Sequence, residues 1–559
     1  MSRPSGRQPR RRVAAVLAAV AALALLARVW DLGWRVAHQD ESRVADWILH
    51  YMDVGAWQYR PIIHGPFLPH VNGVVFDLLG ASDFTMRLVV AVAGALLVVT
   101  PWLLRERLSQ PAVVATSLFF AANPVLLYYS RFMRNDLLLA GFMFAAFGLF
   151  VRAVDTGKAR YLYAAALPFA LAFTTKENAL LYPVCWLGAL ALVLDGRLVL
   201  AGAGDETTRW AVARSHVRRV ARAAWRYKLH LGAALAEAAV VVVAFYAPKP
   251  DLYEALGDPA MLPGVLREAT LGSWHEFVQL WGSTGTQEHS YVAFLKHDLT
   301  VLTVGATALV VFAVLGFLHE RYATTEPRPV VEACFYWGAF SVFGYPAVAD
   351  ISAAWSMINA IVPLAVPAGV GVALVYDRGR EAAAAGNSAG ARAVALALLV
   401  TAAGTGAVAA QTTYANPQGP DNVLVQYAQP AGEMQPTLQG IQEVSASNDG
   451  TDVLYYGDTF HNPDDLTEQP ELNITHGGYT GWFERLPLPW YFDQYDANAS
   501  STLHNETVVE RQPPVVVALD DEDAALEDTL PERGYTRTVH QGYQYGRPVV
   551  FYVRANATA

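Results

Sequence analysis

The sequence predicts a mostly α-helical, polytopic membrane protein that carries an α/β domain outside the membrane at its C-terminus. Of its 559 residues, 53% are hydrophobic and only 16% are charged, whereas about a quarter of the residues of a soluble protein are charged. The apolar residues also form long runs without charge, such as 13–27 and 393–410. Because a helix needs about 20 residues to cross the hydrocarbon core of a bilayer, these runs predict spanning helices.

We predict a membrane domain over residues 1–411 with about eleven transmembrane helices. The first span follows a strongly basic N-terminal segment. We interpret it as an uncleaved helix over 13–32, because no typical cleavage site is followed by a polar mature start. The later spans are expected at 84–104, 111–128, 136–154, 160–176, 178–195, 229–247, 298–318, 329–349, 357–376 and 393–411.

The charges of the loops predict the orientation in the membrane. Every loop that would face the cytoplasm contains Arg or Lys, and the 196–228 loop holds a cluster of arginines. Since basic residues favour the cytoplasmic side, we expect a multi-pass protein of the cell membrane. Its N-terminus would be cytoplasmic and its C-terminal domain extracellular.

Residues 412–559 form the predicted C-terminal domain, which has 22 acidic residues, 6 arginines and no lysine. Such a surface is what a halophilic environment favours, while binding of a basic partner and plain solvation are the alternatives. Short apolar runs predict strands at 453–456, 515–519 and 549–553, and helices are expected at 436–446 and 521–530. Sequons for glycosylation occur at Asn473, Asn498, Asn505 and Asn556.

The clearest chemical signal is the segment His38-Gln39-Asp40-Glu41-Ser42, directly after the first span. Two adjacent carboxylates at a membrane surface can supply a general base and an acceptor for the charge of a partner. A solvated loop start is the alternative reading of the same residues.

Three further polar segments are expected on the same side of the membrane. They are centred on His64, on the stretch from Arg131 to Asp136, and on Lys176. Each could be an ordinary helix end whose charge reaches to the water. Together they gather cations that could bind a phosphate and carboxylates that could activate a hydroxyl. Lysine is rare in this chain, with 5 against 35 arginines, and Glu177 could hold the Lys176 ammonium in place.

Other classes of site leave no signature. The sequence has no P-loop, no CxxC or HExxH metal motif and no G-x-S-x-G elbow. A divalent metal could be held by His64, Glu288 and His289, with ordinary loop residues as the alternative, and we expect no other cofactor. Cys185 and Cys334 both lie in apolar runs, which favours buried thiols over a disulfide.

Taken in order, these motifs resemble those of the GT-C membrane glycosyltransferases. They are the Asp-Glu pair after the first helix, Tyr-x-x-x-x-His-Gly-Pro-Phe at 59–67, Arg-x-x-Arg-Asn-Asp at 131–136 and Thr-Lys-Glu at 175–177. The chain is most similar to the protein O-mannosyltransferase and aminoarabinose transferase group. It is closer still to archaeal relatives named for association with lipid-linked oligosaccharide flippase activity. The resemblance covers most of residues 13–376.

The resemblance implies a GT-C-like fold and an inverting transfer of a sugar from a polyprenyl (dolichyl) phosphate at the outer face. In this family pattern, Asp40 matches the catalytic base, Asp136 the second acidic loop residue, and Lys176 a cation beside the donor phosphate. We therefore predict as catalytic residues Asp40, Glu41 and Asp136. We predict as donor phosphate-binding residues Lys176, Arg131, Arg134 and His64.

The acceptor stays open, because the chain departs from the family pattern at two places. His64-Gly65-Pro66 stands where relatives have Pro-Pro, and Ala353-Ala354-Trp355-Ser356 only loosely matches their late Pro-Trp. Expected partners are a polyprenyl-phosphate-linked sugar, the lipid bilayer and proteins of a glycosylation pathway, but no nucleic acid.

Two other functions compete with sugar transfer. The first is a non-catalytic partner of a lipid-linked oligosaccharide flippase in protein N-glycosylation. The second is a secondary transporter. Transporters place ionisable residues and broken helices at mid-membrane, whereas the charges here gather at the outer helix ends, so the transporter reading is disfavoured.

Overall fold

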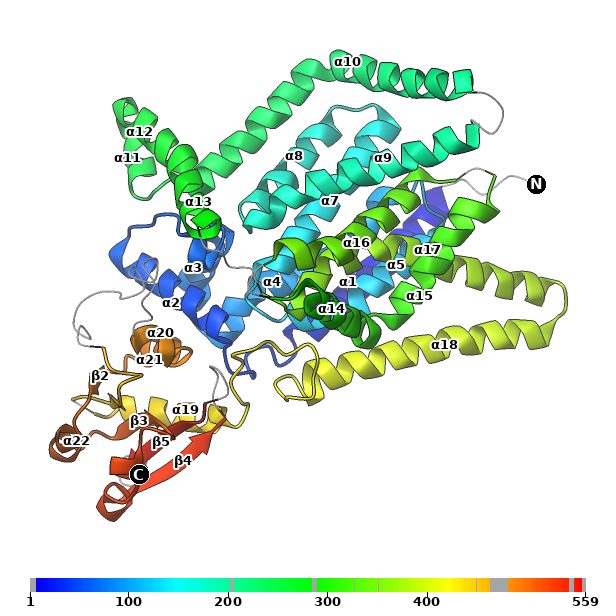
Figure 1. Cartoon of the computed structure of the whole chain (residues 1–559). Coiled ribbons are helices and arrows are strands. Elements are labelled where there is room, and N and C mark those ends of the chain that lie inside the picture. The colour runs from blue at the N-terminus through cyan, green and yellow to red at the C-terminus, as the bar shows by residue number, and fades with distance from the viewer. Residues whose placement is uncertain are drawn as a thin grey trace. The chain divides into compact units, whose positions relative to one another are not determined.

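Two units make up the computed structural model, which describes residues 7–201, 206–283, 289–325, 327–349, 351–448, 450–462, 481–541 and 547–554 (Figure 1). The first, here called the bundle unit, comprises Met1–Trp30, Trp57–Leu68 and Leu88–Pro417. The second, here called the sheet unit, comprises Asp31–Ala56, Pro69–Arg87 and Gln418–Ala559. Each unit therefore combines segments that are distant in the sequence.

Helices account for most of the bundle unit. They are α1 (Arg7–Val29), α5 (Gln110–Ala122), α6 (Pro124–Tyr129), α7 (Asn135–Thr156), α8 (Arg160–Phe173), α9 (Leu181–Ala201), α10 (Glu206–Tyr246), α11 (Asp251–Gly257), α12 (Leu262–Arg267), α13 (Ser273–Ser283), α14 (Tyr291–Gly305), α15 (Thr307–Leu318), α16 (Pro329–Val348), α17 (Ile358–Ala384) and α18 (Ser388–Ala410). Two more, α3 (Phe67–Leu79) and α4 (Asp83–Leu97), contain residues of both units. The predicted mostly helical membrane fold is thus confirmed.

Seven helical segments in the described part of the chain are long and apolar enough to cross a membrane. An eighth span results if α14 and α15, which meet at a bend of 95°, count as one broken helix. Other predicted spans correspond to shorter pieces. For example, the run at 111–128 is divided at Asn123, which is extended before Pro124, because proline disfavours helical geometry in the residue before it. The count of about eleven stays a prediction.

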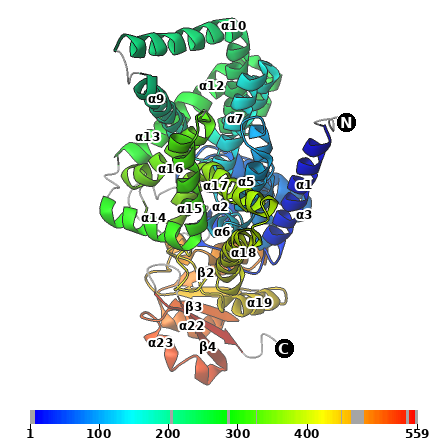
Figure 2. The ribbon, with the colours of Figure 1, turned by 90° about the vertical axis from the view of Figure 1, so that its right-hand side faces the viewer.

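The core of the bundle unit lies around α17. Its residues from Ile358 to Gly371 are buried, and the helix packs against α5, α15 and α16, which Figure 2 shows beside it. Gly371 and Gly316 let α17 and α15 approach closely, since an added Cβ at either position would overlap a backbone carbonyl of the other helix. Small residues serve helix packing in membranes in this way.

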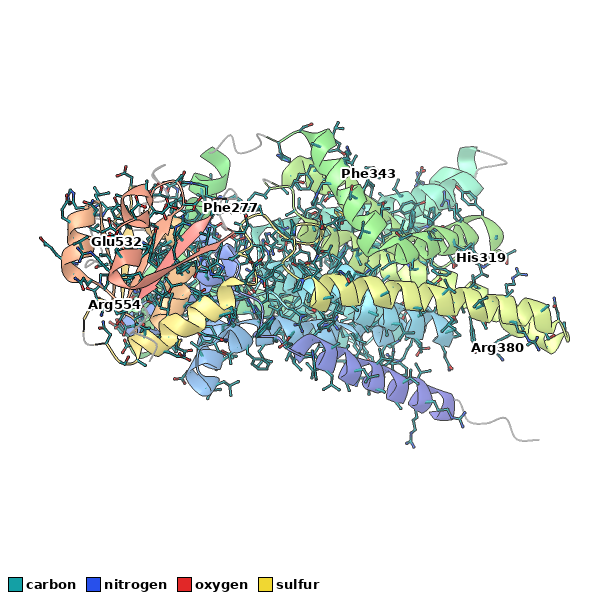
Figure 3. All side chains as sticks on the ribbon, turned by 90° about the horizontal axis from the view of Figure 1, so that it is seen from below. Phe277, His319, Phe343, Arg380, Glu532 and Arg554 are labelled. Atoms are coloured by element: carbon teal, nitrogen blue, oxygen red, sulfur yellow. The ribbon has the colours of Figure 1, made fainter. Side chains whose placement is uncertain are left out.

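Basic side chains lie at one end of the bundle. Figure 3 shows Arg380 and His319 at that end and Phe277 toward the other. Arg380 and His319 belong to loops or helix ends that the sequence predicts to be cytoplasmic, whereas Phe277 belongs to a predicted extracellular segment. The arrangement within the bundle unit is thus consistent with the predicted alternation of the loops.

A five-stranded sheet with order β2-β1-β3-β5-β4 forms the centre of the sheet unit. Its strands are β1 (Val453–Tyr456), β2 (Ala499–Thr502), β3 (Val515–Leu519), β4 (Tyr535–His540) and β5 (Val549–Arg554). β1 runs parallel to β2 and β3, whereas β5 is antiparallel to β3 and β4. Around the sheet lie α19 (Met434–Ser445), α20 (Gly481–Arg485), α21 (Leu488–Gln494), α22 (Asn505–Arg511) and α23 (Ala524–Glu527). The three predicted strands are all present, and so is the predicted α/β character.

The sheet unit also contains α2 (Gln39–Val54) and the segment from Pro69 to Arg87. Trp490 Nε1 and the Tyr491 hydroxyl, both on α21, donate hydrogen bonds to the Asp83 carboxylate at 2.8 and 2.9 Å. The Tyr491 oxygen also accepts a hydrogen bond from the backbone amide of Ala37. Two segments of the first predicted outer loop are therefore fixed to a helix of the C-terminal domain.

Candidate functional site

Asp40 and Glu41 lie in the first turn of α2, where a capping box starts the helix. His38 is the N-cap residue, and its Nδ1 accepts a hydrogen bond from the Asp40 amide at 3.0 Å. In return, Glu41 Oε2 accepts a hydrogen bond from the His38 amide at 3.0 Å. This reciprocal pair satisfies amides that the helix leaves unpaired, so it fixes the start of α2 and the orientation of the Glu41 carboxylate.

Glu41 is fully buried between two guanidinium groups. Arg35 Nη2 lies 2.9 Å from Glu41 Oε2, and Arg87 contacts both carboxylate oxygens at 3.0 and 3.1 Å. Burial alone would raise the pKa of the Glu41 carboxyl, but the two arginines more than offset it and hold that pKa below its usual range. A carboxylate so engaged is suited to anchoring α2 and poorly suited to accepting a proton.

The Asp40 side chain has a different orientation from that of the adjacent Glu41. Its side chain is 23% exposed, and its contacts are with Arg43 at 3.2 Å and with His38 Nδ1 at 3.9 Å. Asp40 is thus the carboxylate of the pair that a substrate could reach. Of the two predicted catalytic residues on α2, its geometry is the one that fits a general base.

A pocket of about 330 Å³ within the bundle unit is lined by three of the other predicted residues, His64, Asp136 and Lys176, but not by Arg131 or Arg134. Polar side chains contribute to its wall from four segments of the unit: His64, Asp136, Lys176, Glu177, Asn178 and Ser356. Leu180, Phe277 and Trp355 are among its apolar lining. A pocket with apolar walls and a few converging charges is typical of a small-molecule or lipid-headgroup site.

Lys176 and Arg134 share one carboxylate. Lys176 Nζ donates a hydrogen bond to Asp136 Oδ1 at 3.1 Å, and Arg134 Nε lies 3.5 Å from Asp136 Oδ2. The Arg134 guanidinium also lies over the Trp355 ring, 3.8 Å from its centroid, an arrangement that stabilises a cation at low polarity. Asp136 is buried in the first turn of α7. Asp136 and Lys176 line the pocket, whereas Arg134 contacts two of its lining residues, Asp136 and Trp355.

Glu177 pairs with His64 rather than with the neighbouring Lys176. His64 Nδ1 lies 3.1 Å from Glu177 Oε2, and the Tyr59 hydroxyl donates to Glu177 Oε1 at 2.9 Å. The backbone around His64 follows that of residues 174–175, because the Gly65 amide donates to the Thr175 carbonyl at 3.0 Å. An added Cβ at Gly65 would overlap the Thr174 carbonyl, so glycine is required for this close approach.

The structure does not bring Arg131 to the pocket wall. Its Nη1 donates hydrogen bonds to the backbone carbonyls of Ala27 and Arg28, at the end of α1, and its guanidinium lies over the Tyr414 ring. Lys and Arg side chains often satisfy the last carbonyls of a helix in this way. Arg131 therefore has a structural position at the α1 terminus.

No group of three His, Cys, Asp or Glu side chains arranged for a metal ion occurs among the described residues. Of the three residues considered from the sequence as metal ligands, His64 is paired with Glu177. His289 is described, but Glu288 lies outside the described residues.

Several contributing residues were not predicted from the sequence. Arg35 and Arg87 hold Glu41, and Tyr59 holds Glu177. Arg87 had a detectable signal, because it is a lone charge in an apolar stretch, and such charges in membrane proteins usually have a partner and a role. Asn178 and Ser356 had none, since single neutral polar residues are common at helix ends.

Comparison with known proteins was made by sequence models and by fold. Residues 63–202 match the model of the dolichyl-phosphate-mannose-protein mannosyltransferase family, and residues 434–554 match that of the Agl23 flippase-associated protein C-terminal domain. The fold is similar to that of ArnT from Cupriavidus metallidurans in the apo state. The two share 15% sequence identity and a TM-score of 0.59, over 97% of this chain and 98% of ArnT.

This chain has the GT-C fold of membrane glycosyltransferases. ArnT bound to undecaprenyl phosphate is also similar, with 17% identity and a TM-score of 0.54, over 97% of this chain and 98% of ArnT. The archaeal oligosaccharyltransferase AglB from Archaeoglobus fulgidus, in complex with an inhibitory peptide and a dolichol phosphate, has 16% identity and a TM-score of 0.53. That match covers 98% of this chain and 74% of AglB. A sequence search among curated proteins found no significant match.

These findings confirm the resemblance that the sequence motifs predicted. The mannosyltransferase match begins at Ile63, next to His64, and includes Asp136 and Lys176. The flippase-associated match covers most of the C-terminal domain. The roles of the individual site residues are not decided by either match and stay predictions.

We predict that Glu41→Gln destabilises the protein. Removing the charge leaves Arg35 and Arg87 buried without their carboxylate, and breaking a buried ion pair costs about 3–5 kcal/mol. Thermal unfolding of the purified protein measures this. Because the Glu41 pKa is lowered by folding, wild-type stability should also fall as the pH drops below the ordinary carboxyl range, and the variant should lack that component.

Asp40→Asn is the matched control, since Asp40 and its partner Arg43 are both partly exposed. Such pairs contribute about 1 kcal/mol or less. If Glu41→Gln unfolds at the same temperature as Asp40→Asn, Glu41 is not the anchor of α2.

Proposed function

We propose that this protein transfers a sugar from a dolichyl-type polyprenyl phosphate to a hydroxyl-bearing acceptor, with inversion at the anomeric carbon. The observation that carries the proposal is the Lys176 ammonium on the wall of the 330 Å³ pocket, where Asp136 holds it at 3.1 Å. A structure of similar fold contains undecaprenyl phosphate and another contains a dolichol phosphate. Both support a polyprenyl phosphate as the lipid part of the substrate.

In this proposal Lys176 and Arg134 bind the phosphate of the donor. Both cations contact the Asp136 carboxylate, which holds them beside the pocket. The Lys176 side chain is 15% exposed, against 2% for that of Asp136. Lys176 is therefore the member of the cluster that a ligand in the pocket can contact, as a compact point charge.

In this proposal Asp40 is the general base. It would take the proton from the attacking hydroxyl while the bond between the sugar and the phosphate breaks and the phosphate oxygen leaves with the electron pair. Arg43 pairs with the Asp40 carboxylate, His38 accepts a hydrogen bond from the Asp40 amide, and Glu41 serves as the anchor of the helix rather than as a second base. Asp136 acts by orienting the cations.

A second candidate is a non-catalytic partner of a lipid-linked oligosaccharide flippase. The match of residues 434–554 to the flippase-associated C-terminal domain favours it. Such a protein would keep the lipid-phosphate pocket and would not need Asp40. The two functions are therefore separated by the dependence of turnover on Asp40.

We predict that Asp40→Asn abolishes transfer while expression and thermal stability stay at the wild-type level. Losing a positioned base costs on the order of 10²–10⁴ in rate. Transfer from labelled dolichyl-phosphate sugars to the acceptor fraction of the membranes measures the effect. Asp421→Asn, on a carboxylate of the sheet unit with no assigned role, is the control. Near wild-type transfer by Asp40→Asn would leave Asp40 a structural residue and favour the flippase-partner function.

We predict that Lys176→Gln weakens dolichyl phosphate binding by at least about tenfold, which corresponds to about 1.4 kcal/mol. Lys176→Arg should recover part of the loss, because a guanidinium retains the charge with a different geometry. Binding is measured at one fixed ionic strength, with Lys296→Gln as the control for loss of an exposed lysine outside the pocket. Equal affinity of the wild type and Lys176→Gln would exclude the phosphate contact.

Our proposed orientation puts the N-terminus in the cytoplasm and the C-terminal domain outside the cell. In a background without Cys185 and Cys334, a membrane-impermeant thiol reagent applied from outside should label a cysteine introduced at His504. It should not label one introduced at Ala385, in the turn between α17 and α18. Both side chains are exposed, so the opposite labelling pattern would invert the orientation.

A further inference from the structure

Asp298 is a buried carboxyl in α14 that has no role in the proposed transfer step. Its residue has no exposed surface, and its Oδ1 lies 2.9 Å from the Ser356 hydroxyl. Among the described residues its Oδ2 has no hydrogen-bond partner, and no opposite charge lies close enough to pair with the carboxyl. Retaining such a carboxyl in a membrane helix costs several kcal/mol, which is why intramembrane carboxyls usually mark a functional site.

Ser356 connects this carboxyl to the pocket. Its hydroxyl lies 2.8 Å from the Ala353 carbonyl as well as 2.9 Å from Asp298, and Ser356 lines the pocket wall. The hydroxyl has a single proton, which serves these two oxygens, so the Ser356 oxygen keeps its capacity to accept a hydrogen bond from the pocket. A negatively charged or polar neighbour strengthens an acceptor in such a chain.

Asn178 adds a second acceptor to the wall. Its Nδ2 donates to the Tyr345 hydroxyl at 3.1 Å, and its Oδ1 is buried without a hydrogen-bond partner among the described residues. The pocket therefore has two unlike parts. Lys176 supplies a positive charge, whereas Ser356 and Asn178 supply oxygen acceptors that call for a donor.

We propose that Ser356 and Asn178 bind hydroxyl groups of the donor's sugar, with Asp298 as a positioning residue that orients and polarises Ser356. This inference rests on the proposed function and assigns the part of the pocket that selects the sugar. A sugar carries several hydroxyl donors beside its phosphate, and a site built to pair with a hydroxyl discriminates against ligands that lack it. The sugar-selecting wall, formed by Ser356 and Asn178, is distinct from the phosphate-binding cation Lys176.

The test compares two probes, dolichyl phosphate and dolichyl phosphate mannose, on the full chain in lipid nanodiscs. The wild type should bind the sugar-bearing lipid more tightly. Ser356→Ala should lose about tenfold in affinity for dolichyl phosphate mannose, as expected for one hydrogen bond with a polarised acceptor. It should bind dolichyl phosphate as the wild type does. Ser356→Thr, which keeps the hydroxyl, should retain most of the preference.

Asp298→Asn is the second variant, in case Ser356→Ala folds poorly. It should reduce the preference for the sugar-bearing lipid and leave affinity for plain dolichyl phosphate unchanged, and that unchanged affinity itself reports a folded pocket. Lys176→Gln should weaken binding of both probes equally. Failure of this Lys176 arm would contradict the proposed phosphate site alone.

Three results would overturn the sugar-selecting wall. They are equal losses for both probes in Ser356→Ala, no loss for either probe, and a wild type that does not distinguish the probes. The first would make Ser356 and Asp298 structural residues that fix the η7 turn (Ala354–Met357). The other two would leave the sugar without contacts to Ser356.

Discussion

The buried ion pairs of Glu41 with Arg35 and Arg87 are the interaction on which the geometry of the proposed base depends. Arg87 comes from the start of the α4 segment and Arg35 from the stretch before α2, so three separate positions of the chain meet at one carboxylate. All three side chains are buried or nearly so, and none could be left unpaired without a large desolvation cost. Because Asp40 is covalently next to Glu41, fixing the buried carboxylate also fixes the backbone position from which the Asp40 side chain projects.

Buried charges are also paired at the pocket, but there some polar groups stay open to a ligand. There Asp136 pairs with both Lys176 and Arg134, and Glu177 is satisfied by His64 and Tyr59. Lys176 is partly exposed at the pocket wall, where Ser356 and Asn178 add oxygen acceptors. Glu41 and its arginines are thus closed off from ligands, whereas Lys176, Ser356 and Asn178 line a pocket, and this difference in access is what separates a structural ion pair from a binding site.

Many of the secondary-structure elements and the family resemblance were predictable from local sequence. Apolar runs predicted the helices, short apolar runs predicted β1, β3 and β5, and the motifs around Asp40 and Lys176 carried the GT-C resemblance. Partners distant in sequence could not be predicted. Lys176 is held by Asp136 instead of the adjacent Glu177, because the turn at Glu177 directs that carboxylate to His64. The bend between α14 and α15 follows Gly305 in an apolar run that contains no proline, and a single glycine in such a run does not by itself predict a break.

The central claim is that the pocket and Asp40 serve a transfer reaction. The most direct measurement uses purified wild-type protein in nanodiscs with dolichyl phosphate carrying a labelled sugar, and follows loss of the label from the lipid with time. Our account predicts time-dependent release of the sugar, by transfer or by slow hydrolysis, with dolichyl phosphate as the lipid product. Tight binding of the labelled lipid without any release, in the presence of membrane acceptors, would contradict it and would establish a binding protein instead.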